Sequence, residues 1–233
     1  MVGTAAIAAV ILALTHTAPA PGLFDLAVGS QAVWHMPGTD PPTIYLTYDD
    51  GPNATTTPML LDVLARERVH ATFFLIDRAI TDRTVPLVAR MFADGHAVAL
   101  HSDSRLDLLM SPAAFARKLT TNADRIERLT GHRPIRGFRP HAGWRSATMY
   151  VGLKRIGYRL IGWGWMRWDW NWYRKRTADA TVARVAARIH AGDIIVMHDG
   201  NVYNPGEDQG HAVEATARLI PLLRSKGYQF GRF

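Results

Sequence analysis

The chain has no cysteine among its 233 residues, and this absence excludes disulfide bonds, thiolate metal sites and cysteine nucleophiles together. It also has no low-complexity tract, no repeat of solenoid or propeller length, and no apolar run of the roughly 20 residues that a membrane-spanning helix needs. What is present is 48% hydrophobic residues, which is enough to build the core of one catalytic-size domain.

Positive charge is in excess, with a formal net charge of +7. Such an excess would suit nucleic acid, a membrane surface or an acidic wall polymer. The Lys and Arg residues are scattered, however, and no nucleic-acid-binding motif is present. We therefore expect no nucleic-acid partner, and keep an anionic wall polymer and a membrane surface as partners that the charge favours.

The first 28 residues differ in character from the rest. An apolar run over residues 5–14 is followed by Ala18, Pro19 and Ala20, which resembles the apolar core and cleavage site of a short signal peptide. No Lys or Arg precedes the run, so a fraying helix on a cytoplasmic protein is the alternative. We predict a signal peptide or weak anchor over residues 1–28, a catalytic domain over residues 41–233, and an extracytoplasmic protein, either secreted or membrane-associated.

Short apolar runs alternate with longer amphipathic segments after residue 42. The predicted strands are residues 43–48, 71–76, 97–101, 137–139, 158–163, 194–198 and 229–230. The predicted helices are residues 57–68, 85–94, 112–130, 146–156, 181–191 and 211–225. This alternation indicates an α/β fold in which parallel strands are joined by helices. Six or seven such units favour a (β/α) barrel, where the carboxyl ends of the strands gather at one mouth.

Polar, titratable residues follow the predicted strands. They are Asp49, Asp50, His101, Arg139, His141, Asp169, His198 and Asp199. Any one of them alone would be explained as a turn or capping residue. Their placement at corresponding positions of separate strand-helix units instead predicts one shared active site.

Five short motifs in this order resemble those of a known family. They are TYDDGP at 47–52, HSDSR at 101–105, RPHAG at 139–143, WDW at 168–170 and VMH at 196–198. With them, the chain from about residue 43 to 233 resembles the polysaccharide deacetylases, carbohydrate esterase family 4, which share the chitooligosaccharide-deacetylase homology domain. The resemblance implies a distorted (β/α) barrel and removal of N-acetyl groups from amino sugars of a polysaccharide, oligosaccharide or lipid-linked glycan.

The resemblance also implies roles for individual residues. Asp49 would be the general base, Asp50 and His101 would bind a divalent metal, Zn²⁺ by preference, and His198 would protonate the leaving amine. Arg139 would hold Asp49 in place, and the backbone N–H of Ala142 would face the oxyanion. A metal ion beside Asp50 would relieve the repulsion between the two adjacent carboxylates.

The second motif departs from the family pattern, because Arg105 stands where a second metal-binding histidine is usual. A guanidinium stays protonated and cannot ligate a metal. Three outcomes follow. His141 could complete a ligand set with Asp50 and His101. Arg105 could itself supply positive charge beside a weak two-ligand site or no metal. The chain could also be a carbohydrate-binding pseudoenzyme, although the retained Asp49, Arg139 and His198 argue against lost turnover.

The fourth motif has Met166 where the family usually has an aspartate that partners the catalytic histidine. Asp169 is the nearest substitute in sequence and Asp199 a poorer one. For substrate contacts we predict Trp144, Asp169 and Trp170. Trp170 lies in a tryptophan-rich segment that could stack on sugars or pack in the core. A related hydrolase of another C–N bond, such as that of an N-formyl sugar, is the closest alternative activity.

Overall fold

The structure is a computed structural model that describes residues 3–4, 25, 32–164, 168–169 and 176–233. The predicted segment 1–28 therefore lies almost wholly outside the described residues, as does Trp170. Among the described residues, no helix is both long enough and apolar enough to cross a membrane.

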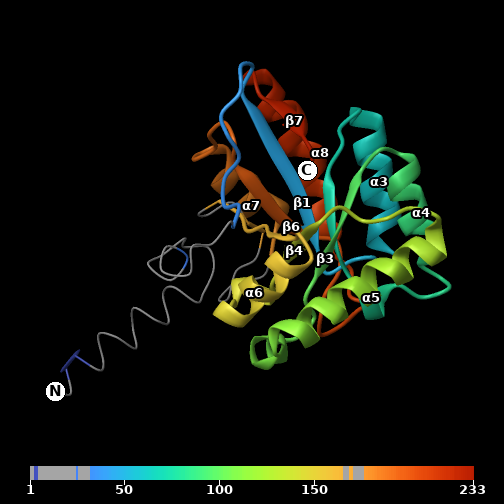
Figure 1. The fold of residues 1–233 in the computed structure, drawn as a ribbon. Helices are drawn as coiled ribbons and strands as arrows, with labels where there is room; N and C mark the ends of the chain where they lie inside the picture. Colours follow the sequence, from blue (N-terminus) through green and yellow to red (C-terminus); the bar gives the residue numbers. More distant parts are fainter. Residues whose placement is uncertain (1–2, 5–24, 26–31, 165–167, 170–175) are drawn as a thin grey trace.

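One parallel sheet organises the molecule. Its strands are β1 (Thr43–Asp49), β2 (Thr72–Ile76), β3 (Ala97–His101), β4 (Gly137–Arg139), β5 (Arg159–Leu160), β6 (Ile194–His198) and β7 (Gln229–Gly231). The order is β5-β4-β3-β2-β1-β6, and β7 pairs with the start of β1. The sheet curls into a distorted half-barrel with helices outside it (Figure 1), so the predicted fold class is confirmed.

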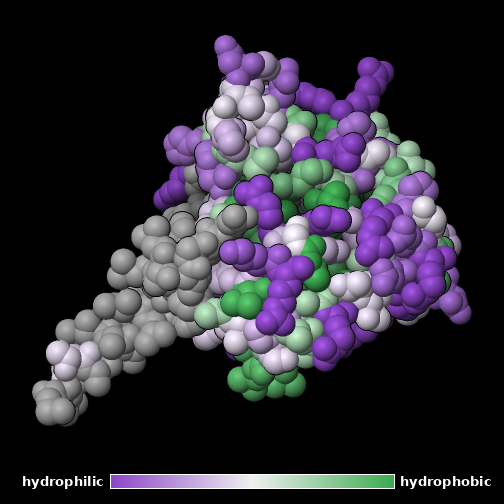
Figure 2. All heavy atoms as spheres, viewed as in Figure 1, coloured by the Kyte–Doolittle hydropathy of each residue, from purple (hydrophilic) through white to green (hydrophobic). Residues whose placement is uncertain are grey.

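Six α-helices are described between and after these strands. They are α3 (Thr56–Glu67), α4 (Val85–Ala93), α5 (Pro112–Thr130), α6 (Ala147–Arg155), α7 (Ala178–Ala186) and α8 (Gly210–Ser225), with short 3-10 turns η1 (Asp77–Ala79), η2 (Arg105–Leu109) and η3 (His141–Gly143). Neighbouring helices pack as a layer over the sheet, α5 beside α6 and α8 beside both α3 and α7. In the view of Figure 2, hydrophilic residues are prominent over α5.

Local sequence explains most of these boundaries. The start of α5 is fixed by Ser111, whose hydroxyl accepts a hydrogen bond from the Ala114 N–H at 3.3 Å, as expected of a helix N-cap. Helix α7 begins earlier than predicted, because Thr177 caps it in the same way through the Ala180 N–H at 3.2 Å. Strand β5 is shorter than the predicted 158–163; it pairs with β4, and on its other side the Val33 N–H donates to the Leu160 carbonyl at 2.8 Å.

Two apolar clusters lie on opposite faces of the sheet. The larger cluster, between sheet and helices, includes Tyr48 and Phe73, whose rings stack at 5.2 Å. The buried Tyr48 hydroxyl is 2.9 Å from the Thr216 hydroxyl of α8, so this polar group is satisfied. The smaller cluster fills the inside of the curl and includes Phe74 and the fully packed Trp163. Its inner position leaves the carboxyl ends of the strands as the open rim.

Candidate active site

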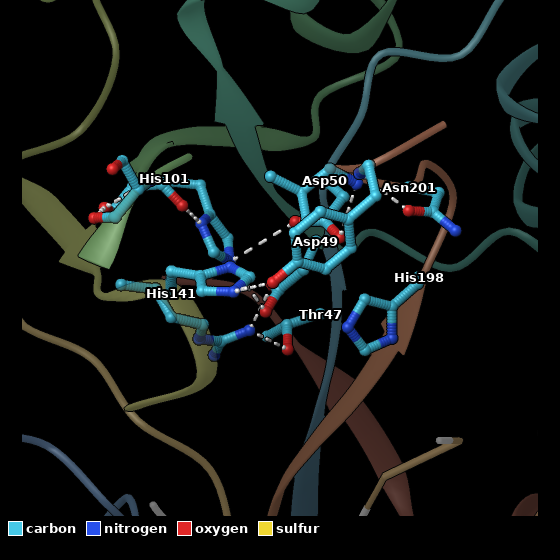
Figure 3. Close-up of polar contacts among 12 residues, drawn as sticks. Thr47, Asp49, Asp50, His101, His141, His198 and Asn201 are labelled. Carbon is cyan, nitrogen blue, oxygen red and sulfur yellow. Dashed lines mark hydrogen bonds and ion pairs between the residues drawn. The ribbon is translucent and has the colours of Figure 1, made fainter. Parts of the chain in front are cut away.

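The sheet register brings the predicted catalytic side chains together at that rim. Asp49 at the end of β1 is aligned with His198 at the end of β6, and His101 of β3 is aligned with Arg139 of β4. Figure 3 shows Asp49 and Asp50 lying between His101 on one side and His198 on the other. The parallel register alone explains why residues 149 positions apart in sequence become neighbours, since parallel strands end at one edge.

Arg139 holds Asp49 in a buried ion pair. One Nη of Arg139 lies 2.6 Å from Asp49 Oδ1 and 2.8 Å from Thr47 Oγ1, and the other donates to the Gly162 carbonyl at 2.8 Å. The guanidinium has no exposed surface and lies 3.8 Å from the Phe74 ring centroid. Burial would raise the pKa of Asp49, but Arg139 and then His101 outweigh it, so that the pKa lies below its usual 3.8. Asp49 is therefore ionised at neutral pH.

Asp50 avoids repulsion with Asp49 by turning the chain. Its φ of 70° lies in the left-handed region, which Asp tolerates better than most residues. Its Oδ2 accepts the Val202 N–H at 3.2 Å, and its Oδ1 lies 3.8 Å from His101 Nε2. The next residue must be Gly51, because a Cβ there would lie 2.4 Å from Asp199 Oδ2. The DDG run at the end of β1 is thus explained by backbone geometry as well as by charge.

His101 presents one ring nitrogen to both carboxylates. Its Nδ1 donates to the Ser102 carbonyl at 2.6 Å, which directs Nε2 toward Asp49 Oδ2 at 3.2 Å and toward Asp50 Oδ1. Burial lowers the pKa of His101, but Asp49, Asp50 and the Ser102 carbonyl together outweigh it, so the pKa is raised above its usual value. Two donor atoms 3.8 Å apart can share one cation at about 2.1 Å from each. Asp50 and His101 therefore fit two positions of a divalent metal site.

His141 is directed at Tyr203 in this structure. Its Nε2 lies 3.1 Å from the Tyr203 hydroxyl, and the two rings meet edge-on with centroids 5.8 Å apart. Within the described parts of the chain, no three His, Cys, Asp or Glu side chains gather so that they could hold a metal ion. The prediction of a ligand set of Asp50, His101 and His141 is therefore not supported. The reason is tertiary: Asn53 donates to the Pro205 carbonyl at 2.8 Å, which anchors the loop carrying Tyr203.

His198 is held by Asp169. Its Nδ1 lies 2.6 Å from Asp169 Oδ1, and its backbone N–H donates to Asp169 Oδ2 at 2.8 Å. Burial lowers the pKa of His198, but Asp169 outweighs this and raises it to about 9. Asp169 is only 1% exposed, and both of its oxygens are directed at His198, so its place in this structure is that of a partner of His198. Asp199 instead accepts from the Thr57 hydroxyl at 2.5 Å.

Sequence reasoning did not single out His211. His211 stands in the first turn of α8, and its Nε2 lies 3.6 Å from Asp169 Oδ2. Asp169 therefore lies between two imidazoles, and both lower its pKa, His198 more than His211. The sequence held one hint, since His211 is the last residue of a polar stretch, residues 200–211, that follows the predicted strand 194–198.

The remaining predicted residues lie on the loops after β3 and β4. Ala142 has φ 50° and ψ 23°, a conformation unusual for a residue with a side chain. Trp144 follows η3 and is half-buried, with the Arg105 guanidinium 5.3 Å from its ring centroid. Arg105 itself is exposed. The loops after β3 and β4 thus bring a cation and an aromatic ring together.

The chain is similar to known proteins in sequence and in fold. The model of the polysaccharide deacetylase family matches residues 37–161. The chitooligosaccharide deacetylase of Sinorhizobium fredii is 36% identical over 199 residues, covering 82% of this chain and 90% of that protein.

Two solved structures have the same fold. A peptidoglycan N-acetylglucosamine deacetylase in complex with 4-naphthalen-1-yl-N-oxidanyl-benzamide has a TM-score of 0.76 at 25% identity, covering 90% of this chain and 94% of that one. A family 4 acetyl xylan esterase from Clostridium thermocellum, in complex with a cobalt ion, has a TM-score of 0.68 at 28% identity, with coverages of 82% and 87%.

Proposed function

Because this chain belongs to the polysaccharide deacetylase family and is a hydrolase of amide C–N bonds, we propose that it deacetylates amino sugars of a glycan with Asp49 as base and His198 as acid. The observation that carries the proposal is the pairing of opposite protonation states on adjacent strands. The positive charge of Arg139 favours the ionised form of Asp49, and the negative charge of Asp169 favours the protonated form of His198. The two groups needed for hydrolysis are therefore ready at the same rim.

Each residue contributes one step. Asp49 takes a proton from the attacking water while Arg139 fixes its other oxygen. The N–H of Ala142 is proposed to donate to the oxyanion, a contribution of about 3 kcal/mol for one such donor. His198 gives its proton to the leaving nitrogen, so water and amide become acetate and a free amine.

Asp50 and His101 are the residues that would hold a metal ion. A divalent cation bound there would lower the pKa of a water toward about 7 and polarise the acetamide carbonyl. Deacetylases of this family are generally metal-dependent. We propose a metal site with two protein ligands in the described chain, completed by groups other than His141.

The direct test is release of acetate from N-acetylglucosamine oligomers, with added Zn²⁺ or Co²⁺ and after chelation. We expect one free amine for each acetate released. Release of formate from N-formyl oligomers, with no acetate from the acetylated ones, would favour the alternative amide hydrolase. Oligomer binding with no product under any metal condition would identify a pseudoenzyme.

Metal binding separates the two histidines. We expect His101→Ala to lower the affinity for Zn²⁺ at least tenfold, because it removes a nitrogen that faces Asp50. We expect His141→Ala to change that affinity by less than about threefold, because His141 Nε2 is directed at Tyr203. Calorimetric titration of both variants checks this, and an equal loss in His141→Ala would return His141 to the ligand set.

A further inference from the structure

We propose that Arg105 is the anion-binding group of a substrate subsite, which selects glycans carrying a carboxylate close to the acetylated sugar. The inference rests on the proposed deacetylase function and names the class of glycan that the site takes. It concerns the one position in the second motif where the family's usual imidazole is replaced by a guanidinium.

The position of Arg105 places its charge on the rim of the site. Arg105 opens η2 four residues after His101, and Trp144 follows η3 after β4. The guanidinium lies 5.3 Å from the centroid of the Trp144 ring. This contact joins the two loops. Its charge also reaches His141, where it is one of the influences that lower the imidazole pKa, after burial and His101. Arg105 thus lies on the loop that follows His101, with its guanidinium beside an aromatic ring and its charge felt at His141.

Among the residues that the structure describes, the acids nearest to Arg105 in sequence are held by other cations. The nearest acids in sequence, Asp103 and Asp107, are already paired with Lys118, whose Nζ lies 3.6 Å and 2.7 Å from them. Arg78 adds a second contact to Asp103 at 3.1 Å. In the described ranges, no carboxylate lies within ion-pair distance of Arg105. One exposed positive charge is therefore left at the mouth of the site.

The chemistry of that charge selects a carboxylate. A guanidinium presents two parallel N–H donors that match the two oxygens of a carboxylate. A single cation balances one carboxylate, whereas a phosphate monoester carries about −1.5 to −2. Tyr203 is 80% exposed and touches His141 through its hydroxyl, so it offers a second aromatic surface for a sugar ring on the same rim.

The experiment uses two forms of one glycan. Peptide-free peptidoglycan strands with free lactyl carboxylates are compared with the same strands after methyl esterification, and kcat/KM for acetate release is measured. We expect the full-length wild-type chain to prefer the acid form by about tenfold, the effect of one charged hydrogen bond. We expect this ratio to fall to about one in Arg105→Gln. The control Arg117→Gln removes one exposed charge from α5 and is expected to keep the preference.

A binding arm separates the two proposals. The affinities of both strand forms are measured with Asp49→Asn, with and without Arg105→Gln. If binding prefers the acid form through Arg105 but the wild type releases no acetate, the proposed deacetylase function is contradicted and the subsite still stands. Acetate release at equal rates from both forms would overturn the subsite and leave the function. Three other results would also overturn the subsite. The chain could fail to bind either strand form, or Arg117→Gln could lose the preference as well. The chain could also prefer 6-phosphorylated N-acetylglucosamine oligomers to the acid strands.

Discussion

Asp49→Asn is expected to lower kcat for acetate release by about 10² to 10⁴, with KM changed by no more than a few fold. Asparagine has nearly the shape of aspartate and still accepts a hydrogen bond from Arg139, but it cannot take a proton from water. The loss therefore falls on the chemical step and leaves substrate binding in place. Retained turnover would remove Asp49 as the base.

The same substitution also leaves Arg139 buried without an ionised partner. Since Arg139 has no exposed surface, some loss of stability accompanies the loss of activity. Binding of N-acetylglucosamine oligomers and the thermal midpoint are therefore measured with the rates. A variant that stays folded at the assay temperature and binds the oligomer has lost the base alone.

Arg139→Gln is expected to have the largest effect on stability, about 3 to 5 kcal/mol, because it leaves the Asp49 carboxylate buried without its cation. The lowered pKa of Asp49 determines how the stability loss depends on pH. In the wild type, the lowered pKa of Asp49 contributes stability above its unfolded value of 3.8, and this is lost as pH falls through the folded value. Without Arg139, burial raises that pKa, so the variant is most destabilised at neutral pH and recovers as the carboxyl is protonated.

Urea unfolding at pH 7 and at pH 5 measures this effect. The double variant Asp49→Asn/Arg139→Gln is expected to be more stable than Arg139→Gln alone, because the unpaired charge is gone. Arg133→Gln is the matched surface control, since Arg133 pairs with Asp124 and Glu127 in solvent, and it should change stability far less. Equal losses in Arg133→Gln and Arg139→Gln would show that burial of the pair is unimportant.

The sequence predicts the rim well because its signals are local. Each of Asp49, His101, Arg139 and His198 directly ends an apolar run, and parallel strands of an α/β fold end at one edge. The bounds of β3, β4 and β6 are the predicted ones, because a proline or a polar residue follows each of these strands. Asp169 was also the predicted partner of His198, from its place in the fourth motif.

The features that sequence did not predict are set by tertiary contacts between distant segments. Tyr203 reaches His141 only because the loop after β6 is tied to the turn after β1 through Asn53. His211 reaches Asp169 because α8 begins beside the catalytic strand. Neither of these two contacts leaves a periodic pattern or a motif in the sequence. The apolar pattern that locates a helix also does not tell which polar side chain of its first turn faces a carboxylate.

The most direct measurement is the pH profile of kcat/KM for acetate release, in the wild type and in Asp169→Asn. We predict that kcat/KM declines only above about pH 9, where His198 loses its proton, because Asp49, whose pKa lies below 3.8, is already ionised well below that limb. In Asp169→Asn, the alkaline limb should move down toward 6.5, the usual pKa of histidine. An alkaline limb that stays in the same place in both proteins would contradict His198 as the acid held by Asp169.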